Sequence, residues 1–235
     1  MKEAVDIYLD SADTSQWTLP AGCPPVVGVT TNPSLVFQAG LPVNLASYER
    51  LVRAAGASGM RQLMVQLPSN DVEAAHGWVE KLQAVATQER VSLTIKLPCH
   101  PSWIDCIAAV QAMNQAILLT GLSNAVQLLW AQSLRADFVA PYVGRLAADS
   151  SQGGRDVWAL IQACVAAQTA QTPHEGPQLL AASIKSPDVL ARLMGMGAAA
   201  VTLPPASLIA WSQDSVTDAA MAQFERDMVA SHALG

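Results

Sequence analysis

Charged and aromatic residues are scarce in this 235-residue chain: they make up 14% and 5% of it, and the net charge is −6. An acidic balance of this kind argues against a surface that binds nucleic acid or an anionic membrane. No apolar run is long enough to span a bilayer. Acidic residues also interrupt the first ten positions, where a signal peptide needs an apolar core. We therefore expect a soluble, cytoplasmic protein that has no nucleic-acid or membrane partner.

Cysteine patterns that would build a metal site or a disulfide framework are also missing. The four cysteines are Cys23, Cys99, Cys106 and Cys164, and they form no Cys-x-x-Cys pair. Their spacing to the four histidines does not match a zinc site either. Scattered cysteines of this kind fit a reducing cytosol. We expect neither a metal nor a cofactor.

What the sequence does contain is an alternation of short apolar runs and helical stretches, with no long linker, which favours one domain over residues 1–235. Eight such runs predict an α/β protein, a (β/α)8 TIM barrel, with an additional C-terminal helix at about 215–231. An open doubly wound sheet is the alternative. That fold normally has a glycine-rich turn after its first strand, where this chain has Ser11-Ala12-Asp13. The predicted strands are 5–10, 26–30, 62–67, 91–98, 116–120, 137–141, 179–184 and 198–203.

Polar residues recur at the C-terminal ends of these strands, where TIM barrels hold their active sites. The most informative is Lys96, because it lies inside an apolar, β-branched run. Burial there would lower its pKa and supply the neutral amine that imine-forming catalysis requires. Taken alone, the stretch favours the simpler interpretation, a lysine that reaches from the strand end to solvent; the other strand ends shift the balance towards a functional role. The strand-end residues are Asp10, Thr30, Gln66, Lys96, Thr120, Tyr142 with Arg145, and Ser183 with Lys185.

The kinds of side chain in this set indicate imine chemistry on a phosphorylated substrate. An amine nucleophile needs carboxylate, amide or hydroxyl groups around it to move protons. Arg145 offers a planar donor for phosphate, and Ser183 adds a hydroxyl near the start of a helix. Without a metal-binding set, an imine is the more plausible way to stabilise a carbanion. Composition alone leaves Lys185 as a competing nucleophile.

Six motifs follow one another along the chain: YLDSAD, GVTTNPS, VQL, TIKLP, APYVGR and LAASIKS. GVTTNPS and APYVGR are specific, whereas YLD and VQL are individually weak. Together the motifs resemble those of the small transaldolase family, and more closely its fructose-6-phosphate aldolase branch. The resemblance extends from about Ile7 to the segment FERDM at 224–228. It implies a TIM barrel, class I (Schiff-base) chemistry without a metal or cofactor, and sugar-phosphate or hydroxyketone and aldehyde substrates.

The resemblance assigns catalytic roles at five positions. Lys96 matches the Schiff-base lysine, and Asp10 matches the acid that orients and exchanges protons near it. Gln66, Thr120 and Tyr142 look like the residues that hold a catalytic water in the aldolase branch.

Five further positions match substrate-binding residues. Thr30, Thr31 and Asn32 match the motif that holds the hydroxyls of the donor substrate. Arg145 and Ser183 match the phosphate-binding pair. The bound partner implied by this set is a small sugar phosphate.

The resemblance also implies a ring-like homo-oligomer, a pentamer or decamer, in which helix 215–231 packs on a neighbouring subunit. An apolar stripe at helical spacing is compatible with that arrangement, and equally with a packing face inside one chain. The stripe consists of Val216, Ala219, Ala220, Phe224 and Met228.

Other positions distinguish the branches of the family. Ala140, like Gln66 and Tyr142, follows the aldolase pattern, whereas Gly144 resembles transaldolases. The segment 99–103 departs from the family pattern after the lysine, and the loop 169–177 is longer than usual. We expect a class I aldolase that reversibly cleaves a ketose phosphate, such as fructose 6-phosphate, into dihydroxyacetone and glyceraldehyde 3-phosphate. Transaldolase is the close alternative, and a non-catalytic phosphosugar-binding barrel is the remote one.

Overall fold

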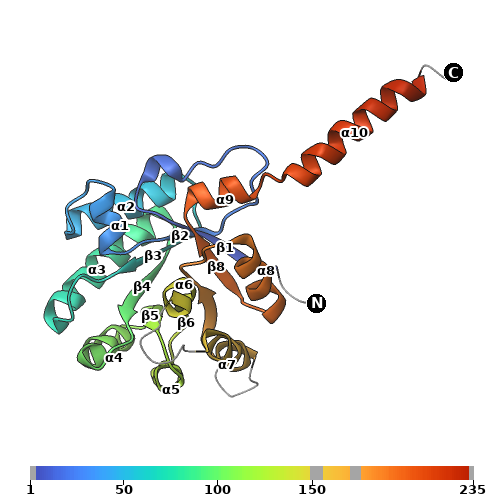
Figure 1. The fold of residues 1–235 in the computed structure, drawn as a ribbon. Coiled ribbons are helices and arrows are strands. Elements are labelled where there is room, and N and C mark those ends of the chain that lie inside the picture. Colours follow the sequence, from blue (N-terminus) through green and yellow to red (C-terminus); the bar gives the residue numbers. More distant parts are fainter. Residues whose placement is uncertain (1–3, 149–155, 170–175, 233–235) are drawn as a thin grey trace.

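Eight parallel strands close into a barrel, which confirms the predicted (β/α)8 architecture (Figure 1). The computed structural model describes residues 4–148, 156–169 and 176–232. Each strand pairs with the next one in the chain, and β8 pairs with β1 to close the ring. The strands are β1 (Asp6–Asp10), β2 (Gly28–Thr30), β3 (Gln62–Gln66), β4 (Ser92–Pro98), β5 (Ile117–Leu122), β6 (Phe138–Pro141), β7 (Gln178–Ala181) and β8 (Ala200–Leu203).

Helices surround the barrel (Figure 1). Their ends follow local signals in the sequence: the Asn32 side chain accepts a hydrogen bond from the Leu35 N–H at 3.1 Å, and Pro33 occupies the first helical position of α1. The helices are α1 (Pro33–Gln38), α2 (Leu45–Ala57), α3 (Val72–Glu89), α4 (Ile104–Ala112), α5 (Ala125–Ser133), α6 (Val143–Ala148), α7 (Val157–Thr169), α8 (Pro187–Met196), α9 (Pro205–Trp211) and α10 (Ser215–His232), with 3-10 turns η1 (Thr14–Gln16) and η2 (Pro101–Trp103).

The largest difference from the predicted strands is at β7. Strand β7 was predicted to reach residue 184 but ends at Ala181, with one isolated bridge from Ala182 to Tyr142. The chain turns there because Ser183 adopts a left-handed backbone conformation, with φ of 60°. Helix α6 begins at Val143, two residues after the end of β6 at Pro141. The predicted long loop at 169–177 falls mostly outside the described residues.

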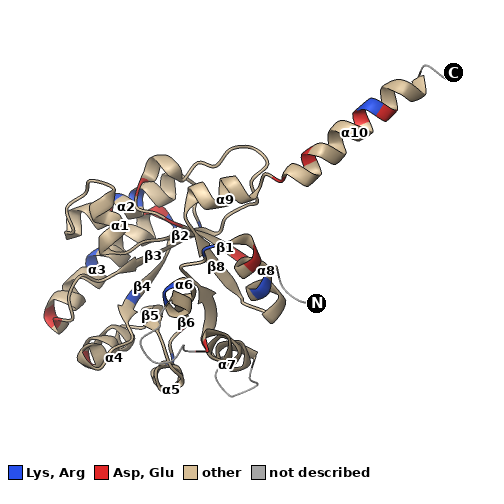
Figure 2. Ribbon diagram, viewed as in Figure 1, with Lys and Arg blue, Asp and Glu red and all other residues tan. Residues whose placement is uncertain are grey.

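The core has two apolar layers because both faces of each strand are covered. One layer lies between the strands and the surrounding helices and includes Leu9, Val65 and Ile95. The smaller one, an apolar cluster inside the barrel, consists of Tyr8, Met64, Leu118, Ala140, Leu180 and Ala200. Figure 2 shows few charged residues on a mostly uncharged ribbon, in line with the composition.

Helix α10 extends away from the barrel (Figure 1). None of its residues is buried, and Val216, Phe224 and Met228 are 76%, 60% and 62% exposed. The interpretation of its apolar stripe as a packing face within the chain is therefore wrong. Within the described parts of the chain, no helix has the length and apolar character needed to cross a membrane.

Candidate active site

Polar side chains form a ring at the C-terminal end of the barrel interior. Alternate residues of a strand point to the same face, so the positions two residues beyond the apolar interior cluster also face inward. Almost all of these positions are polar, so polar side chains from successive strands surround the C-terminal opening of the barrel. They are Asp10 on β1, Gln66 on β3, Thr120 on β5, Tyr142 after β6, Ala182 after β7 and Thr202 on β8.

A cavity of about 720 Å³ opens over this ring. Most of the predicted site residues line it, which brings together side chains from β1 through the turn after β7. Two do not, Thr30 and Thr31, although the Thr31 carbonyl accepts a hydrogen bond from Lys96. The predicted residues that line it are Asp10, Asn32, Gln66, Lys96, Thr120, Tyr142, Arg145 and Ser183.

Lys96 is 6% exposed and does not reach bulk solvent. Its Nζ donates a hydrogen bond to the backbone carbonyl of Thr31 at 2.9 Å. Burial lowers the pKa of Lys96, because the ammonium loses its hydration, while the nearby charge of Asp10 acts in the opposite direction. The lowered pKa increases the fraction of neutral, nucleophilic amine.

Asp10, Thr30 and Thr202 form a hydrogen-bonded row across adjacent strands. Thr30 Oγ1 lies 2.8 Å from Asp10 Oδ1 and 2.7 Å from Thr202 Oγ1. The sequence analysis did not identify Thr202, although it lines the cavity. The signal was present, since Thr202 stands near the C-terminal end of the eighth apolar run, as the other ring residues do in theirs.

A second pair of hydroxyls lies on the opposite side of the ring. The Thr120 hydroxyl donates to the Tyr142 hydroxyl at 2.8 Å. The Gln66 side chain lines the same cavity, and its backbone carbonyl accepts a hydrogen bond from Tyr48 at 3.0 Å, which ties β3 to α2. These three side chains could together hold a water molecule over the site.

Thr31 and Asn32 bring different groups to the site. The Thr31 hydroxyl is buried without a hydrogen-bond partner, and its carbonyl is occupied by Lys96. The Asn32 side-chain oxygen accepts from Leu35 N as the cap of α1. Its amide group therefore remains as the donor that a substrate hydroxyl could meet.

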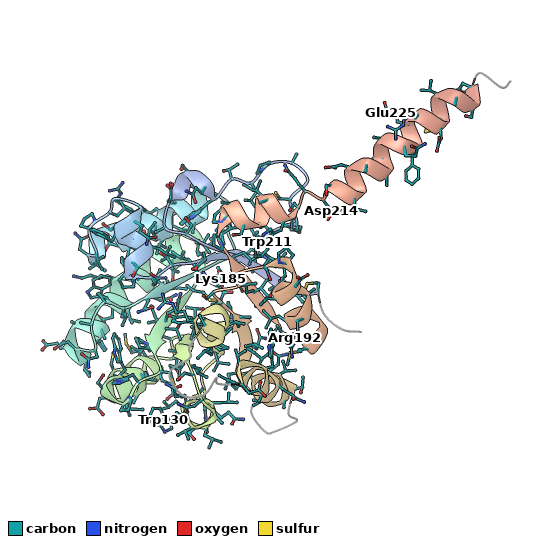
Figure 3. The ribbon with its side chains drawn as sticks, in the orientation of Figure 1. Trp130, Lys185, Arg192, Trp211, Asp214 and Glu225 are labelled. Atoms are coloured by element: carbon teal, nitrogen blue, oxygen red, sulfur yellow. The ribbon has the colours of Figure 1, made fainter. Side chains whose placement is uncertain are left out.

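Gly144 allows a close approach between the α6 start and the turn after β7. Its N–H donates to the Ser183 carbonyl at 2.9 Å. A Cβ at position 144 would clash with that carbonyl oxygen and lie 2.7 Å from Lys185 Cγ. The Lys185 stem thus runs across Gly144, and Lys185 lines the cavity. Figure 3 labels Lys185 near the centre of the barrel. Because Lys185 is exposed, its ammonium keeps its water, unlike that of Lys96.

Arg145 completes this side of the cavity. Its guanidinium carbon lies 5.0 Å from the centre of the Tyr142 ring, within the range of a cation–π contact. With Ser183 and Lys185 it gives the rim two cations and a hydroxyl, a set suited to an anionic group. Among the residues that line the cavity, Asp10 is the one carboxylate.

The segment 99–103, which departs from the family pattern, does not line the cavity. Cys99 is buried, its N–H donates to Thr120 O at 2.9 Å, and its carbonyl accepts from the Gln127 side chain at 2.6 Å. Burial raises the pKa of the Cys99 thiol to about 11, so the sulfur stays protonated and unreactive at neutral pH. This segment fixes the end of β4 against β5 and α5.

The site offers an amine, a carboxylate, hydroxyls and amides. The described ranges 4–148, 156–169 and 176–232 contain no cluster of three or more His, Cys, Asp or Glu residues that could hold a metal ion. Fold and site together define a TIM barrel with a buried lysine at the mouth of its cavity.

The family follows from the sequence of the whole chain. The transaldolase/fructose-6-phosphate aldolase family matches residues 7–234, and the chain belongs to this family. Membership makes it an aldolase- or transaldolase-type enzyme and confirms the resemblance noted from the motifs.

Solved structures similar to the chain support the fold alone. Thiamine phosphate pyrophosphorylase from Pyrococcus furiosus is 10% identical, with a TM-score of 0.55 over 87% of this chain and 88% of that one. Phosphonopyruvate hydrolase in complex with oxalate and Mg²⁺ is 13% identical, with a TM-score of 0.59 over 95% of this chain and 83% of that one. Such low identities carry no information about the substrate.

Proposed function

We propose that this protein is a cytoplasmic, metal-independent class I aldolase. It would reversibly cleave a ketose phosphate such as fructose 6-phosphate into dihydroxyacetone and glyceraldehyde 3-phosphate. The observation that carries the proposal is the buried Lys96 amine, which shares a cavity with one carboxylate and several hydroxyls. Membership in the transaldolase/fructose-6-phosphate aldolase family supports it.

The first step forms an imine. The neutral Lys96 amine attacks the C2 carbonyl of the ketose, and the carbinolamine loses water. Asp10, whose charge acts on Lys96, supplies and recovers the protons of this step. The lowered pKa of Lys96 increases the fraction of neutral amine that can make this attack.

The second step breaks the C3–C4 bond. The iminium accepts the electron pair of that bond, while a water held by Gln66, Thr120 and Tyr142 takes the proton from the C4 hydroxyl. The aldehyde leaves, and the enamine is protonated at C3. Hydrolysis of the resulting imine releases dihydroxyacetone and restores the Lys96 amine.

Substrate orientation follows from the charges around the cavity. Arg145, Ser183 and Lys185 lie on one side and suit the phosphate of the aldehyde half. The Asn32 amide and the Thr202 hydroxyl also line the cavity and suit the hydroxyls of the donor half. This arrangement favours a phosphorylated sugar over a neutral one.

Transaldolase activity is the second candidate, and Gly144 is the observation that favours it. In a transaldolase the enamine attacks an acceptor aldehyde instead of taking a proton. The test is release of free dihydroxyacetone from fructose 6-phosphate, with and without erythrose 4-phosphate. Release without acceptor supports the aldolase, and strict dependence on the acceptor supports the transaldolase. Binding without any turnover would favour a phosphosugar-binding barrel.

We also propose that α10 packs on a neighbouring subunit in a ring-like homo-oligomer, a pentamer or decamer. The support is the exposed apolar stripe of α10, together with the resemblance to ring-forming relatives. Light scattering on the full chain and on a chain that ends before Ser215 tests this. Loss of the oligomer on truncation is expected, and an unchanged mass would contradict it.

A further inference from the structure

A row of hydrogen bonds, Asp10–Thr30–Thr202, connects the single carboxylate that lines the cavity, Asp10, to the hydroxyl of Thr202. Thr30 is fully buried and Thr202 is 2% exposed. Thr202 lines the cavity, whereas Thr30 does not. Thr30 therefore joins two groups that both face the cavity, and it exchanges hydrogen bonds with both.

The direction of these hydrogen bonds follows from the number of hydrogens. An ionised carboxylate only accepts, so the single Thr30 hydroxyl hydrogen goes to Asp10. The hydrogen bond between the two threonines must then use the Thr202 hydrogen. In this state Thr202 presents only oxygen lone pairs to the cavity.

Protonation of Asp10 on Oδ1 reverses the row. The Asp10 hydroxyl then donates to Thr30, and Thr30 turns its hydrogen towards Thr202. The Thr202 hydrogen is released from the threonine pair and can point into the cavity. The two threonine hydroxyls only rotate about their C–O bonds, so the hydrogen bonds change partners and no covalent bond of either threonine breaks.

We propose that Thr202 is a substrate-contacting residue whose hydrogen-bonding polarity follows the protonation state of Asp10. It accepts a hydrogen bond from a ketose hydroxyl while Asp10 is ionised, and it donates one after Asp10 has taken a proton. Because Asp10 exchanges protons during the reaction, contact at Thr202 changes in step with the chemistry. This inference rests on the proposed aldolase or transaldolase function.

Other ionisable groups face the same cavity and must be held constant in any test. Besides Asp10 on β1, four ionisable side chains line it. They are Lys96 on β4, Tyr142 after β6, Arg145 on α6 and Lys185 in the turn after β7.

The test compares Thr202→Val with Thr202→Ser. Valine keeps the shape and removes the hydroxyl, whereas serine keeps the hydroxyl. We expect valine to lower kcat/KM for the ketose phosphate about 10-fold, the upper end of the loss typical of a hydrogen bond between neutral groups. Serine should stay within about threefold of wild type. The pH dependence of kcat/KM should change in Thr202→Val only, because the contact at position 202 then no longer follows the state of Asp10.

Thr94→Val is the matched control, because Thr94 is also buried in the barrel but bonds to Gln62 instead of facing the cavity. It should leave the pH profile unchanged. An equal loss in the serine variant or in the Thr94 control would overturn the inference, and so would a Thr202→Val enzyme with wild-type rates and pH profile. If the valine variant does not fold, Thr202→Ala takes its place.

Failure of the inference is distinguishable from failure of the proposed function. Borohydride trapping with dihydroxyacetone should label wild type and Thr202→Val alike at end point, since both keep Lys96. Wild type that traps no imine would refute the proposed function. Wild type that traps it, beside a fully active Thr202→Val, would refute only the role of Thr202.

Discussion

The barrel interior contains two polar networks, which differ in what they leave available. Towards the N-terminal ends of the strands, the Tyr8 hydroxyl donates to the Gln62 side chain at 2.6 Å, and the Gln62 amide donates to Thr94 at 2.8 Å. Towards the C-terminal ends, the Lys96 amine and the Asp10–Thr30–Thr202 row border a cavity of about 720 Å³. The first, which we call the lower network, holds strands together. The second, the upper network, presents reactive groups.

The difference shows how one fold separates stability from function. Buried polar groups stabilise a structure only when they are paired, and the lower network pairs its side chains with one another. The upper network keeps a buried lysine, Lys96, whose amine makes a single hydrogen bond, to the Thr31 backbone carbonyl. That arrangement costs stability and provides a nucleophile.

The largest expected effect comes from removing the amine of the upper network. Lys96→Met should lower turnover by roughly a thousandfold or more, because no imine can form. Steady-state release of dihydroxyacetone measures the loss. Lys185→Met is the matched control and should keep turnover of a non-phosphorylated substrate. Substantial turnover by Lys96→Met would contradict the assignment of the nucleophile.

The next effect comes from the Thr120–Tyr142 pair. Tyr142→Phe removes the acceptor of the 2.8 Å bond from Thr120 and should lower release of free dihydroxyacetone about 10- to 100-fold. Transfer to an added acceptor aldehyde should fall to a similar extent, because both routes begin with removal of the C4 hydroxyl proton during C3–C4 cleavage. Wild-type rates of both activities in Tyr142→Phe would argue against a water held at this position.

A smaller effect is expected at the rim of the cavity. Gly144→Asn should displace both the Ser183 carbonyl and the Lys185 stem, since a Cβ there would clash with that carbonyl oxygen and meet Lys185 Cγ at 2.7 Å. We expect KM for the phosphorylated ketose to rise roughly tenfold, the worth of one charge-assisted hydrogen bond, while kinetics with free dihydroxyacetone stay unchanged. In a Lys185→Met background the same substitution should still raise KM, because the clash with the Ser183 carbonyl remains. A wild-type KM in Gly144→Asn would contradict the assignment of this rim to the phosphate.

The buried lysine also predicts how stability depends on pH. Burial lowers the pKa of Lys96, so between that value and its ordinary pKa of about 10.4 the unfolded chain binds more protons than the folded one. Wild-type stability should therefore rise with pH across this window. Lys96→Met should be more stable than wild type at neutral pH, with a gain that shrinks towards pH ~10. Denaturant unfolding at several pH values measures this, and Lys185→Met, which keeps the buried Lys96, should follow the pH dependence of wild type.

The lower network should respond in the opposite way to the upper one. Tyr8→Phe leaves the Gln62 oxygen without its donor and should reduce the free energy of unfolding by about 1–3 kcal/mol. Turnover of the folded variant should remain at the wild-type level. Loss of activity without loss of stability would break the separation between the two networks.

Much of the upper ring was predictable from the sequence because parallel strands bring their C-terminal ends to one place. Lys96, Asp10 and Tyr142 line the cavity as the strand-end pattern indicated. Thr202 was missed although it obeys the same pattern. The individual roles of these residues stay predictions until variants are measured.

Other features depend on contacts that no local pattern encodes. The approach of Lys185 to Gly144 follows from the left-handed conformation of Ser183, which a non-glycine residue rarely adopts. The apolar stripe of α10 was recognisable, but its periodicity does not tell what covers it. The sequence also could not show that the segment 99–103 lies away from the cavity.

The central claim, that Lys96 forms the Schiff base, is tested most directly by borohydride reduction in the presence of dihydroxyacetone followed by mass mapping of the peptides. The account predicts one stable adduct on the peptide that contains Lys96, and none on the Lys185 peptide. An adduct at Lys185, or an adduct that persists in Lys96→Met, would contradict it.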